Sequence, residues 1–451
     1  MKVTIEKLGS VEGADIDVKP LTILVGGNNT GKTYVMYVLW NILQRRFSAN
    51  LGFLEEMASS LRAKGVAQVN LPSFLSDHLK ALENAVADGT RRRLPNLFRG
   101  SPELFESTRI KVDVESEAVI EAATANKFST NIGGDFSKRS QTINADKPAS
   151  SDTLTITQLS KELPLALVSQ FLFGVFANML IKPTAKDVVL LPAERAALNI
   201  FAPDLDTQNA ALLRQLKRER VNVGELIEQL TVAQYAEPIE EYLRLLKRFP
   251  RAVRTKGLFH DDALELQKKI AKVRYKVDKD GLITAQPYKS DAVLGLHLTS
   301  STVKNIYGLW AYLEGMAEPG DCLMIDEPEL NLHPDNQRLV ARALARLVNR
   351  GIRVVISTHS DYMIREFNNL IMLSQAFAER DALAQKYGYE IDAEALSIDK
   401  VSAYHFSDSS SEPIKIESTF GIEVKSMDDA MSGLNSSNTE IHFALSAALG
   451  V

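Results

Sequence analysis

Short apolar runs recur along this sequence, and several of them lead through a turn into a longer helical stretch. Four runs have the length and the β-branched content of buried parallel strands: Leu21–Val25, Asp187–Leu191, Cys322–Ile325 and Val354–Ser357. Longer segments between and after these runs predict helices: Tyr34–Leu43, which has neither Gly nor Pro, and Thr302–Gly315, Asp335–Arg350 and Asp361–Phe377. Alternation of strands with helices predicts an α/β fold built on a largely parallel sheet.

The ends of the chain add further strands to this pattern. Val3–Ile5 and Ala14–Val18 are strand-like and precede Leu21–Val25, while Val401–Phe406 and Ile414–Glu417 come late, before a helix from about Met427. We therefore expect a mixed β-sheet core flanked by helices.

The middle of the chain is less regular. Leu51–Lys64 and Phe74–Asp88 are predicted to be helices, and three segments are predicted to be strands: Arg109–Val114, Ala118–Ala123 and Thr153–Thr157. Lys127–Asp152 is rich in Ser, Thr, Asn, Asp and Gly, which fits either a surface loop or a meander of short strands.

A charged helical stretch runs from Asp206 to Lys272, with breaks at Pro238 and Pro250. A hairpin is predicted from Lys272–Val277 and Leu282–Ala285. The sequence thus divides into the first part of the core (1–48), a mixed α/β insertion (49–186), a strand with a helical insertion and hairpin (187–290), and the rest of the core (291–451).

One segment has almost the length of a membrane span. Leu163–Ile181 carries no charged residue, but Pro164, Ser169, Gln170 and Asn178 interrupt it. The charged residues on its two sides show no clear asymmetry. A helix buried in a large α/β core is the better interpretation.

Composition narrows the class of protein. The 451 residues carry a formal net charge of −5 and a single cysteine, Cys322, so neither an intrachain disulfide nor a cysteine-cluster metal site is possible. A reducing cytoplasm is the expected location, and the first residues lead directly into a strand without the pattern of a signal peptide.

Three basic clusters stand out against this mildly acidic average. Arg45-Arg46 ends the first predicted helix, and Gly89–Arg93 is a short basic run. The largest cluster comprises Arg244, Lys247, Arg248, Arg251, Arg254 and Lys256. Such a cluster is usually a solvated helix face, although contact with nucleic acid or an acidic partner is the alternative.

The most specific chemical signal is the turn after Leu21–Val25. It satisfies the pattern G-x-x-x-x-G-K-[ST] at every fixed position and reads Gly26-Gly27-Asn28-Asn29-Thr30-Gly31-Lys32-Thr33. Glycines allow the backbone N–H groups to face one point at a helix N-terminus, which forms a nest for phosphate oxygens. We expect Lys32 to reach the β- and γ-phosphates of a nucleoside triphosphate, and the Thr33 hydroxyl to bind Mg²⁺.

Two carboxylates supply the second half of this site. Asp326 and Glu327 follow the apolar run Cys322–Ile325, at the strand end where α/β sheets bind ligands. Asp326 is suited to binding Mg²⁺ through water, and Glu327 to polarising the water that attacks the γ-phosphate. His359 follows the next predicted strand and is the candidate γ-phosphate sensor.

The order of these motifs resembles that of the ABC-type ATPases, within them the branch of SMC, RecF and OLD proteins. The resemblance is carried by Gly27–Thr33, by Asp-Glu-Pro-Glu-Leu-Asn-Leu-His-Pro at 326–334 and by Ser-Thr-His-Ser-Asp at 357–361. It covers roughly the first 45 residues and residues 187–376. It implies a P-loop NTPase of ABC-ATPase type that hydrolyses ATP.

The family's signature maps onto Thr299, Ser300, Ser301 and Thr302, where serines replace the usual glycines. Hydroxyl residues at a helix start still provide an N-cap and free N–H groups. The resemblance implies a homo-oligomer in which two copies stack head to tail, each ATP lying between one P-loop and the partner's signature. It also makes Arg195, in Leu191–Arg195, a candidate for a phosphate contact or the dimer interface, with a structural salt bridge as the alternative.

The chain has no long heptad run like that of SMC proteins and no acidic Toprim-like segment after His359. It therefore looks like a compact ATPase of this branch, similar to the ATPases of the bacterial Septu and PARIS anti-phage systems. This implies a sensor that regulates a separate effector, such as a Toprim or HNH nuclease, with nucleic acid as a possible ligand and no membrane. The alternative is a RecF-like clamp in DNA repair.

Overall fold

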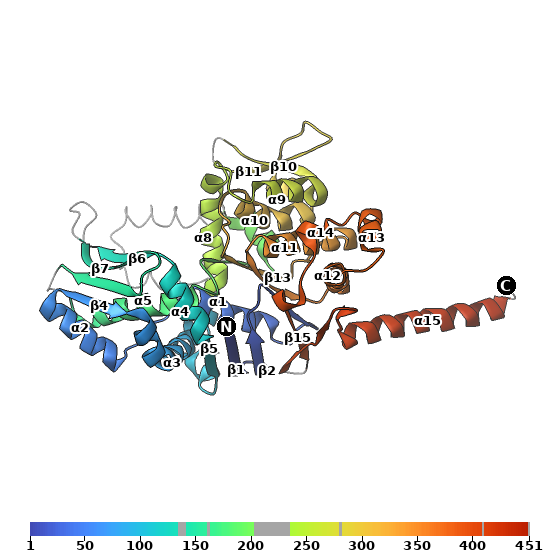
Figure 1. Ribbon diagram of the computed structural model, residues 1–451. Coiled ribbons are helices and arrows are strands. Elements are labelled where there is room, and N and C mark those ends of the chain that lie inside the picture. The colour runs from blue at the N-terminus through green and yellow to red at the C-terminus, as the bar shows by residue number, and fades with distance from the viewer. Residues whose placement is uncertain (134–140, 160–162, 203–234, 279–281, 408–409, 450–451) are drawn as a thin grey trace, which may run out of the picture.

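A single mixed sheet forms the centre of the protein (Figure 1). The structure is a computed structural model that describes residues 1–133, 141–159, 163–202, 235–278, 282–407 and 410–449. Nine described strands follow one another across the sheet in the order β5-β1-β2-β16-β15-β3-β14-β13-β9. The expected mixed sheet flanked by helices is confirmed.

Five neighbouring strands of this sheet are parallel: β15 (Val401–Ser407), β3 (Leu21–Gly26), β14 (Arg353–Thr358), β13 (Cys322–Asp326) and β9 (Val188–Leu191). Their central residues are buried on both faces, which explains why they appear in the sequence as continuous apolar runs. Because the strands are parallel, all of their carboxyl ends lie at one edge of the sheet.

The other strands contribute the antiparallel pairs of the sheet, apart from a short parallel pairing of β16 with β2. β1 (Lys2–Leu8) pairs with β2 (Val11–Asp17) and with β5 (Arg109–Asp113), and β16 (Ser410–Pro413) pairs antiparallel with β15. Val3 and Ile5 are buried while the residues between and beside them are less so, as expected for a strand with one face on the core.

Two hydrophobic cores lie on opposite faces of the sheet, because successive side chains of a strand point to opposite sides. Leu24, Met324 and Val355 belong to the core that also contains helix α1 (Lys32–Leu43). Ile23, Leu323 and Ile325 belong to the core that contains α10 (Ser301–Gly315), α11 (Pro334–Asn349) and α12 (Asp361–Met372). The predicted positions of these helices are confirmed, although α12 ends five residues earlier than expected.

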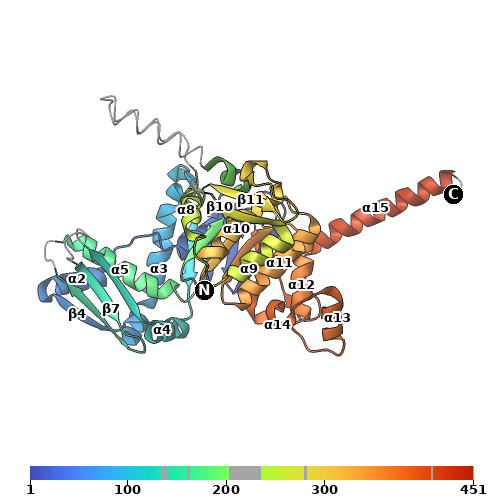
Figure 2. The same cartoon turned by 90° about the horizontal axis from the view of Figure 1, so that it is seen from above.

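A separate lobe is inserted after α1 (Figures 1 and 2). Its four-stranded antiparallel sheet has the order β4-β8-β7-β6. The strands are β4 (Val66–Asn70), β8 (Thr153–Gln158), β7 (Gln141–Lys147) and β6 (Phe128–Gly133). The described part of Lys127–Asp152 is thus mainly two paired strands, which settles the alternative left open by the sequence, apart from residues 134–140, which lie outside the described residues.

The helices of this lobe are α2 (Gly52–Lys64), α3 (Leu71–Phe98), α4 (Ser116–Ala125) and α5 (Leu165–Ile181), with a 3₁₀ turn at Pro102–Phe105. The predicted strand at Ala118–Ala123 is wrong, since this segment lies in α4. α3 is longer than expected: it begins after Asn70, whose side chain accepts the N–H of Ser73, and it includes Gly89 and the basic run after it.

The apolar segment Leu163–Ile181 contains the buried helix that was predicted, α5. Its side chains pack in the same core as α1 and α2. Among the described residues, no helix is both long and apolar enough to cross a membrane.

The described elements between residues 237 and 295 form a further region, which lies above the sheet in the view of Figure 1. Helix α8 (Glu237–Ala252) precedes α9 (His260–Glu265), a π-helical turn (Leu266–Ala271) and the antiparallel strands β10 (Val273–Val277), β11 (Ile283–Pro287) and β12 (Leu294–Gly295). The predicted hairpin is confirmed. The expected helix over 206–234 lies outside the described residues, and Pro250 does not break α8 but stands in its last turn.

The remaining small elements are short. A 3₁₀ turn at Leu296–Leu298 precedes α10, and the later elements are α13 (Arg380–Tyr387), α14 (Ile391–Glu394), a 3₁₀ turn at Ile398–Lys400, β17 (Ile416–Glu417) and β18 (Gly421–Ile422). The last helix, α15 (Lys425–Leu449), extends away from the body in both views (Figures 1 and 2).

Candidate nucleotide site

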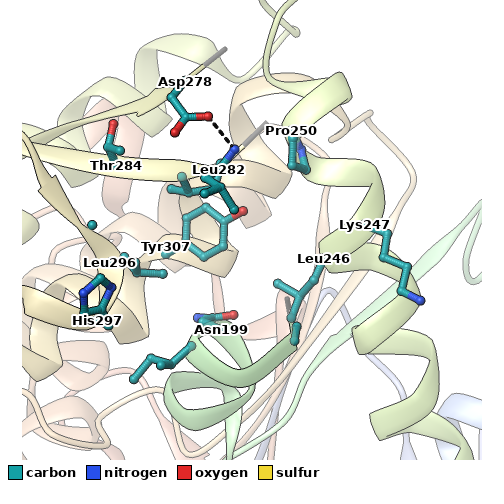
Figure 3. A pocket seen from close by; sticks show the side chains of 14 residues that line it. Asn199, Leu246, Lys247, Pro250, Asp278, Leu282, Thr284, Leu296, His297 and Tyr307 are labelled. Carbon is teal, nitrogen blue, oxygen red and sulfur yellow. Dashed lines mark hydrogen bonds between the residues drawn. The ribbon is translucent and has the colours of Figure 1, made fainter. Parts of the chain in front are cut away.

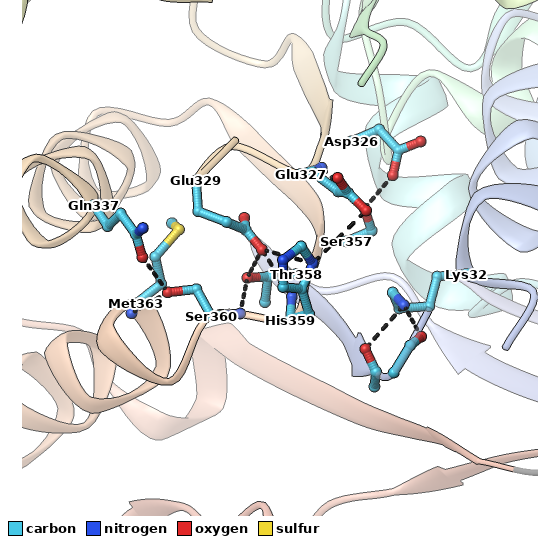
Figure 4. Close-up of polar contacts among 12 residues, drawn as sticks. Lys32, Asp326, Glu327, Glu329, Gln337, Ser357, Thr358, His359, Ser360 and Met363 are labelled. Carbon is cyan, nitrogen blue, oxygen red and sulfur yellow. Dashed lines mark hydrogen bonds and ion pairs between the residues drawn. The ribbon is translucent and has the colours of Figure 1, made fainter. Parts of the chain in front are cut away.

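The candidate site lies at the edge where the parallel strands end (Figure 4). β14 lies between the strand that precedes the P-loop and the strand that carries Asp326. Asp326 is opposite Ser357, and Thr358 is opposite Val25. This register brings the turn at Gly26–Thr33, the Asp326-Glu327 pair and His359 together, although Thr33 and Asp326 are 293 residues apart in the sequence.

The P-loop turn is shaped by two of its glycines. Gly31 has φ +88° immediately before α1, and a Cβ on it would collide with the Val11 side chain. A Cβ on Gly26 would collide with the carbonyl oxygen of Phe406 on the neighbouring strand. Asn28 and Asn29 are exposed at the tip of the turn, and the Thr30 hydroxyl donates to the Gly27 carbonyl (3.0 Å).

The Lys32 ammonium lies within the loop itself. Its Nζ donates to the carbonyl oxygens of Gly26 (2.9 Å) and Gly27 (2.6 Å). Burial lowers the pKa of Lys32, while the carboxylates of Glu327, Asp326 and Glu329 oppose this change. A cation held here by carbonyl groups is placed to meet an anion that enters the nest of loop N–H groups.

Two oxygen donors suited to a divalent cation are already adjacent. The Thr33 hydroxyl donates to Asp326 Oδ2 (2.9 Å), and the other oxygen of Asp326 accepts the hydroxyl of Ser357. Hydroxyl and carboxylate oxygens are the ligands that Mg²⁺ prefers. The donor set therefore fits the predicted Mg²⁺ ligands Thr33 and Asp326.

Glu327 has an unusual backbone conformation. Its φ of +49° lies in the left-handed region, and its N–H donates to the carbonyl (3.2 Å) and hydroxyl (3.1 Å) oxygens of Ser357. Partial burial raises the pKa of its carboxyl group, and Asp326 adds to this rise while His359 opposes it. A carboxylate that is less acidic than usual is a better general base.

His359 lies beside this carboxylate on a loop that a second acid holds (Figure 4). Its Nδ1 is 3.7 Å from Glu327 Oε1 and 3.5 Å from Glu329 Oε1. The buried Glu329 accepts the Thr358 hydroxyl (2.7 Å) and the His359 backbone N–H (2.8 Å) through the same oxygen. Glu329 thus joins the turn after β13 to the loop after β14.

Arg195 is not at a surface. Only 2% of the residue is exposed, and its guanidinium donates to the carbonyl oxygens of Pro192 (3.0 Å), Asp326 (2.7 Å) and Glu327 (2.8 Å). The expectation of a phosphate or dimer contact is therefore wrong, and so is the alternative of a salt bridge, because the acceptors are carbonyl groups. Arg195 instead fixes the backbone that presents the two acids.

The signature segment stands at the start of α10. The Ser300 hydroxyl accepts the Val303 N–H (3.3 Å) as an N-cap, and Ser300 and Ser301 are exposed while Thr299 is partly buried. Behind them, Asn305 donates to the carbonyl oxygen of Leu330 (2.8 Å). Within the described chain no hydrogen bond joins this segment to the P-loop turn, so their predicted meeting across two copies stays a prediction.

A separate cavity of about 390 Å³ opens next to the signature (Figure 3). It lies between α8, α10 and the β10–β11 hairpin, and mainly apolar side chains such as Leu246, Leu296 and Tyr307 line it. None of the P-loop or acidic site residues is among the described residues that line it.

Three residues of the site were missed by the sequence interpretation: Ser357, Thr358 and Glu329. Ser357 and Thr358 are fully buried polar residues at the end of β14, so a polar pair at the carboxyl end of an apolar strand is a usable signal. Glu329 lies in a motif that the sequence prediction used, but no role was predicted for it. Its hydrogen-bond donors, Thr358 and His359, stand about thirty residues later in the sequence.

Comparison with known proteins adds one family and several distant structures. The family described as "AAA ATPase domain" matches residues 96–364, more than half of the chain, in a range that begins after the P-loop. No curated protein matches.

Among solved structures, an Smc head domain with an extended coiled coil bound to the C-terminal domain of ScpA, derived from Pyrococcus furiosus, has 13% identity and a TM-score of 0.34, covering 97% of this chain and 98% of that chain. An SMC head domain from Thermotoga maritima has 10% identity and a TM-score of 0.31, covering 92% and 98%. An SmcHead bound to the C-winged helix domain of ScpA has 12% identity and a TM-score of 0.33, covering 92% and 96%.

Proposed function

The chain belongs to the AAA ATPase domain family, and we propose that it binds ATP with Mg²⁺ at the edge described above and hydrolyses it. The observation that carries this proposal is the convergence of Lys32, Thr33 and Asp326 with Glu327 and His359 at the ends of three adjacent parallel strands. Membership of an ATPase family implies nucleotide binding and hydrolysis.

Each side chain has a role that matches its position. Lys32 and the loop N–H groups bind the β- and γ-phosphates, and Thr33 and Asp326 hold Mg²⁺, which neutralises phosphate charge when it is bound. Glu327 accepts the proton of the attacking water, and His359 contacts the γ-phosphate. Glu329 and Arg195 position these groups without touching the nucleotide.

Two variants test the assignment. Glu327→Gln keeps the size of the side chain but cannot accept the proton, so hydrolysis should fall by about 10²- to 10⁴-fold while ATP binding is retained. Lys32→Ala should abolish binding of a fluorescent ATP analogue. A Glu327→Gln protein that hydrolyses ATP at the normal rate would show that the base has been wrongly assigned.

We further propose that two copies assemble head to tail around ATP, with Thr299, Ser300 and Ser301 of one copy facing the P-loop of the other. In support, Ser300 and Ser301 are exposed at a helix start, where backbone N–H groups are free to bind an anion. Size-exclusion chromatography of Glu327→Gln should show a larger species with ATP than with ADP. An unchanged elution volume would contradict the assembly.

For the biological role, we propose a regulator that controls a separate effector, such as a nuclease, in bacterial anti-phage defence. The support is the resemblance of 326–334 and 357–361 to compact ATPases of that kind. Affinity purification from the native host, in the presence of ATP, should recover the effector in a fixed ratio to this chain. Recovery of this chain alone, during infection as well as before it, would count against the role.

A RecF-like DNA clamp is the second candidate, and the surface of α8 and the segment after it favours it. Arg248, Arg251, Arg254 and Lys256 are exposed, and within the described chain no ion pair involves them. Binding of duplex DNA should then fall steeply as salt increases, because phosphate contacts release counterions. If ATP does not increase DNA retention at any salt concentration, this candidate is rejected.

A further inference from the structure

Two basic runs that lie far apart in the sequence meet in one cavity. Arg45 and Arg46 follow α1, and Arg92 and Arg93 belong to α3. The cavity has a volume of about 370 Å³ and is lined by Arg45, Arg46, Phe47, Ser48, Gly89, Arg92 and Arg93. Four of these side chains are guanidinium groups, and no carboxylate is among the described residues that line the cavity. We call it the arginine pocket.

The fold fixes the walls of the arginine pocket. Arg45 donates to the carbonyl oxygens of Ala185 (3.1 Å) and Lys186 (2.9 Å), which follow the end of α5. A Cβ on Gly89 would lie 2.9 Å from Phe47 Cβ and 3.3 Å from the Ser48 carbonyl oxygen. Only glycine therefore lets α3 approach the turn after α1 this closely.

Part of the positive charge is balanced by acids of α8, which packs beside α3. Arg46 pairs with Glu241, and Arg93 pairs with Glu237 (2.6 Å). These two ion pairs have a structural explanation, since they join α8 to the turn after α1 and to the inserted lobe. These ion pairs do not balance the charges of the other two arginines of the pocket, Arg45 and Arg92.

Arg45 and Arg92 leave an excess of positive charge. Within the described chain neither has an ion pair, and the exposed Arg92 makes a single hydrogen bond, from one Nη to the Ser48 carbonyl (3.2 Å). Burial lowers the pKa of Arg45 and the carboxylate of Asp187 opposes this change, and a guanidinium does not lose its proton in proteins. The positive charge of Arg45 and Arg92 at this cavity is therefore not balanced by an ion pair within the described chain, and an anion that enters the cavity would offset it.

We propose that the arginine pocket binds a phosphate group, at a site separate from the P-loop. The planar guanidinium presents paired N–H donors that match the oxygens of phosphate, which a lysine cannot do. The pocket lies at the opposite end of α1 from Lys32, about 18 Å away for a helix of 12 residues. The phosphate belongs either to a small phosphorylated molecule or to a nucleic-acid backbone, and the two sources share this chemistry.

The test uses the full chain with its ATP site saturated by a non-hydrolysable ATP analogue and Mg²⁺. Calorimetry at constant ionic strength then measures binding of inorganic phosphate and, separately, of a ten-nucleotide oligothymidylate. Arg92→Glu should weaken binding at least about tenfold, as expected when a charge-assisted hydrogen bond is lost. The matched control is Arg91→Glu, since Arg91 is the exposed neighbour on α3 that does not line the pocket, and it should change binding less than about twofold.

Comparing the affinities for inorganic phosphate and for the oligonucleotide shows which kind of molecule supplies the phosphate group. Loss of phosphate binding in Arg92→Glu supports a small phosphorylated ligand, and loss of oligonucleotide binding alone supports a backbone phosphate. Equal weakening by both variants overturns the proposal, because it shows only general attraction to a basic surface. Absence of binding by the unmodified chain also overturns it. Circular dichroism checks the fold, and Arg92→Gln replaces Arg92→Glu if the reversed charge prevents folding.

Discussion

At the scale of single residues, the environment of Glu327 predicts a pH dependence. The carboxyl group acts as a base only when it is ionised, and partial burial raises its pKa above the ordinary value of 4.5. Hydrolysis at saturating ATP should therefore be full at neutral pH and should fall as the pH drops through this raised pKa. Initial rates measured between pH 4.5 and 8 would show the midpoint.

Binding of a fluorescent ATP analogue over the same range provides the control, since it should not follow the rate. A rate that stays constant down to pH 4.5 would show that Glu327 is ionised throughout, or that another group is the base.

Glu329 gives a second prediction at this scale, as a positioning residue. Glu329→Ala removes the acceptor of the Thr358 hydroxyl and of the His359 N–H, so the buried hydroxyl and the N–H both lose the group that accepts them. The free energy of unfolding should fall by about 2 kcal/mol, and the hydrolysis rate should fall with it. Urea unfolding and steady-state ATPase assays measure the two effects.

Glu329→Gln separates positioning from a role of the charge. Its amide oxygen can still accept both hydrogen bonds, so it should restore most of the rate that alanine loses. If glutamine is as slow as alanine, the negative charge of Glu329 matters directly and the positioning role is contradicted.

At the scale of elements, the junction of the P-loop with the sheet predicts opposite results for two adjacent glycines. A Cβ on Gly26 would meet the Phe406 carbonyl of β15, whereas a Cβ on Gly27 would meet nothing within 4 Å. Gly26→Ala should therefore push β3 and β15 apart, lower the melting temperature and abolish ATP binding. Gly27→Ala should retain the melting temperature of the unmodified chain within about 2 °C, as for an exposed surface change.

Differential scanning fluorimetry with and without ATP compares the pair. Equal destabilisation by both changes would show that the loop, and not its contact with β15, limits substitution.

The elements themselves show which parts of the fold can be predicted from the sequence. Leu21–Val25 and Cys322–Ile325 were recognised because strands buried on both faces leave continuous apolar runs. The segment Ala118–Ala123 was predicted to be a strand because Val119 and Ile120 are β-branched. In the structure its buried residues are Val119 and Ala123, which are four residues apart, as expected for one face of a helix. β4 escaped notice since only Val69 of its residues is buried.

The residues of the candidate site also fall into two groups, those that can be predicted from the sequence and those that cannot. Lys32, Thr33 and the acids at 326 and 327 follow from local motifs whose spacing is fixed by a turn. Ser357, Glu329 and Arg195 act through partners on other strands, and such contacts depend on the order of strands in the sheet. These residues meet because β14 lies between β3 and β13, and no local sequence pattern predicts this order of strands.

At the scale of the whole molecule, the proposed head-to-tail assembly predicts that two inactive variants restore each other. Lys32→Ala inactivates a P-loop, and Ser301→Arg should block the exposed start of α10 without disturbing the core. If each site takes its P-loop from one copy and its signature from the other, a mixed dimer contains one site with both halves intact. An equal mixture should then recover about a quarter of the unmodified rate, since half of the dimers are mixed and each has one working site.

The variants are measured alone, mixed, and mixed after a period that allows the subunits to exchange. Lys32→Ala with Glu327→Gln serves as the matched control, because both changes affect the half of the site supplied by one copy. In a mixed dimer of this control pair each P-loop half carries a defect, so no rate should return. Recovery in the control as well as in the test mixture would mean that Lys32 and Glu327 serve different sites. Failure of the Lys32→Ala and Ser301→Arg mixture to recover, with both proteins folded and shown to exchange, would place the complete site within one copy.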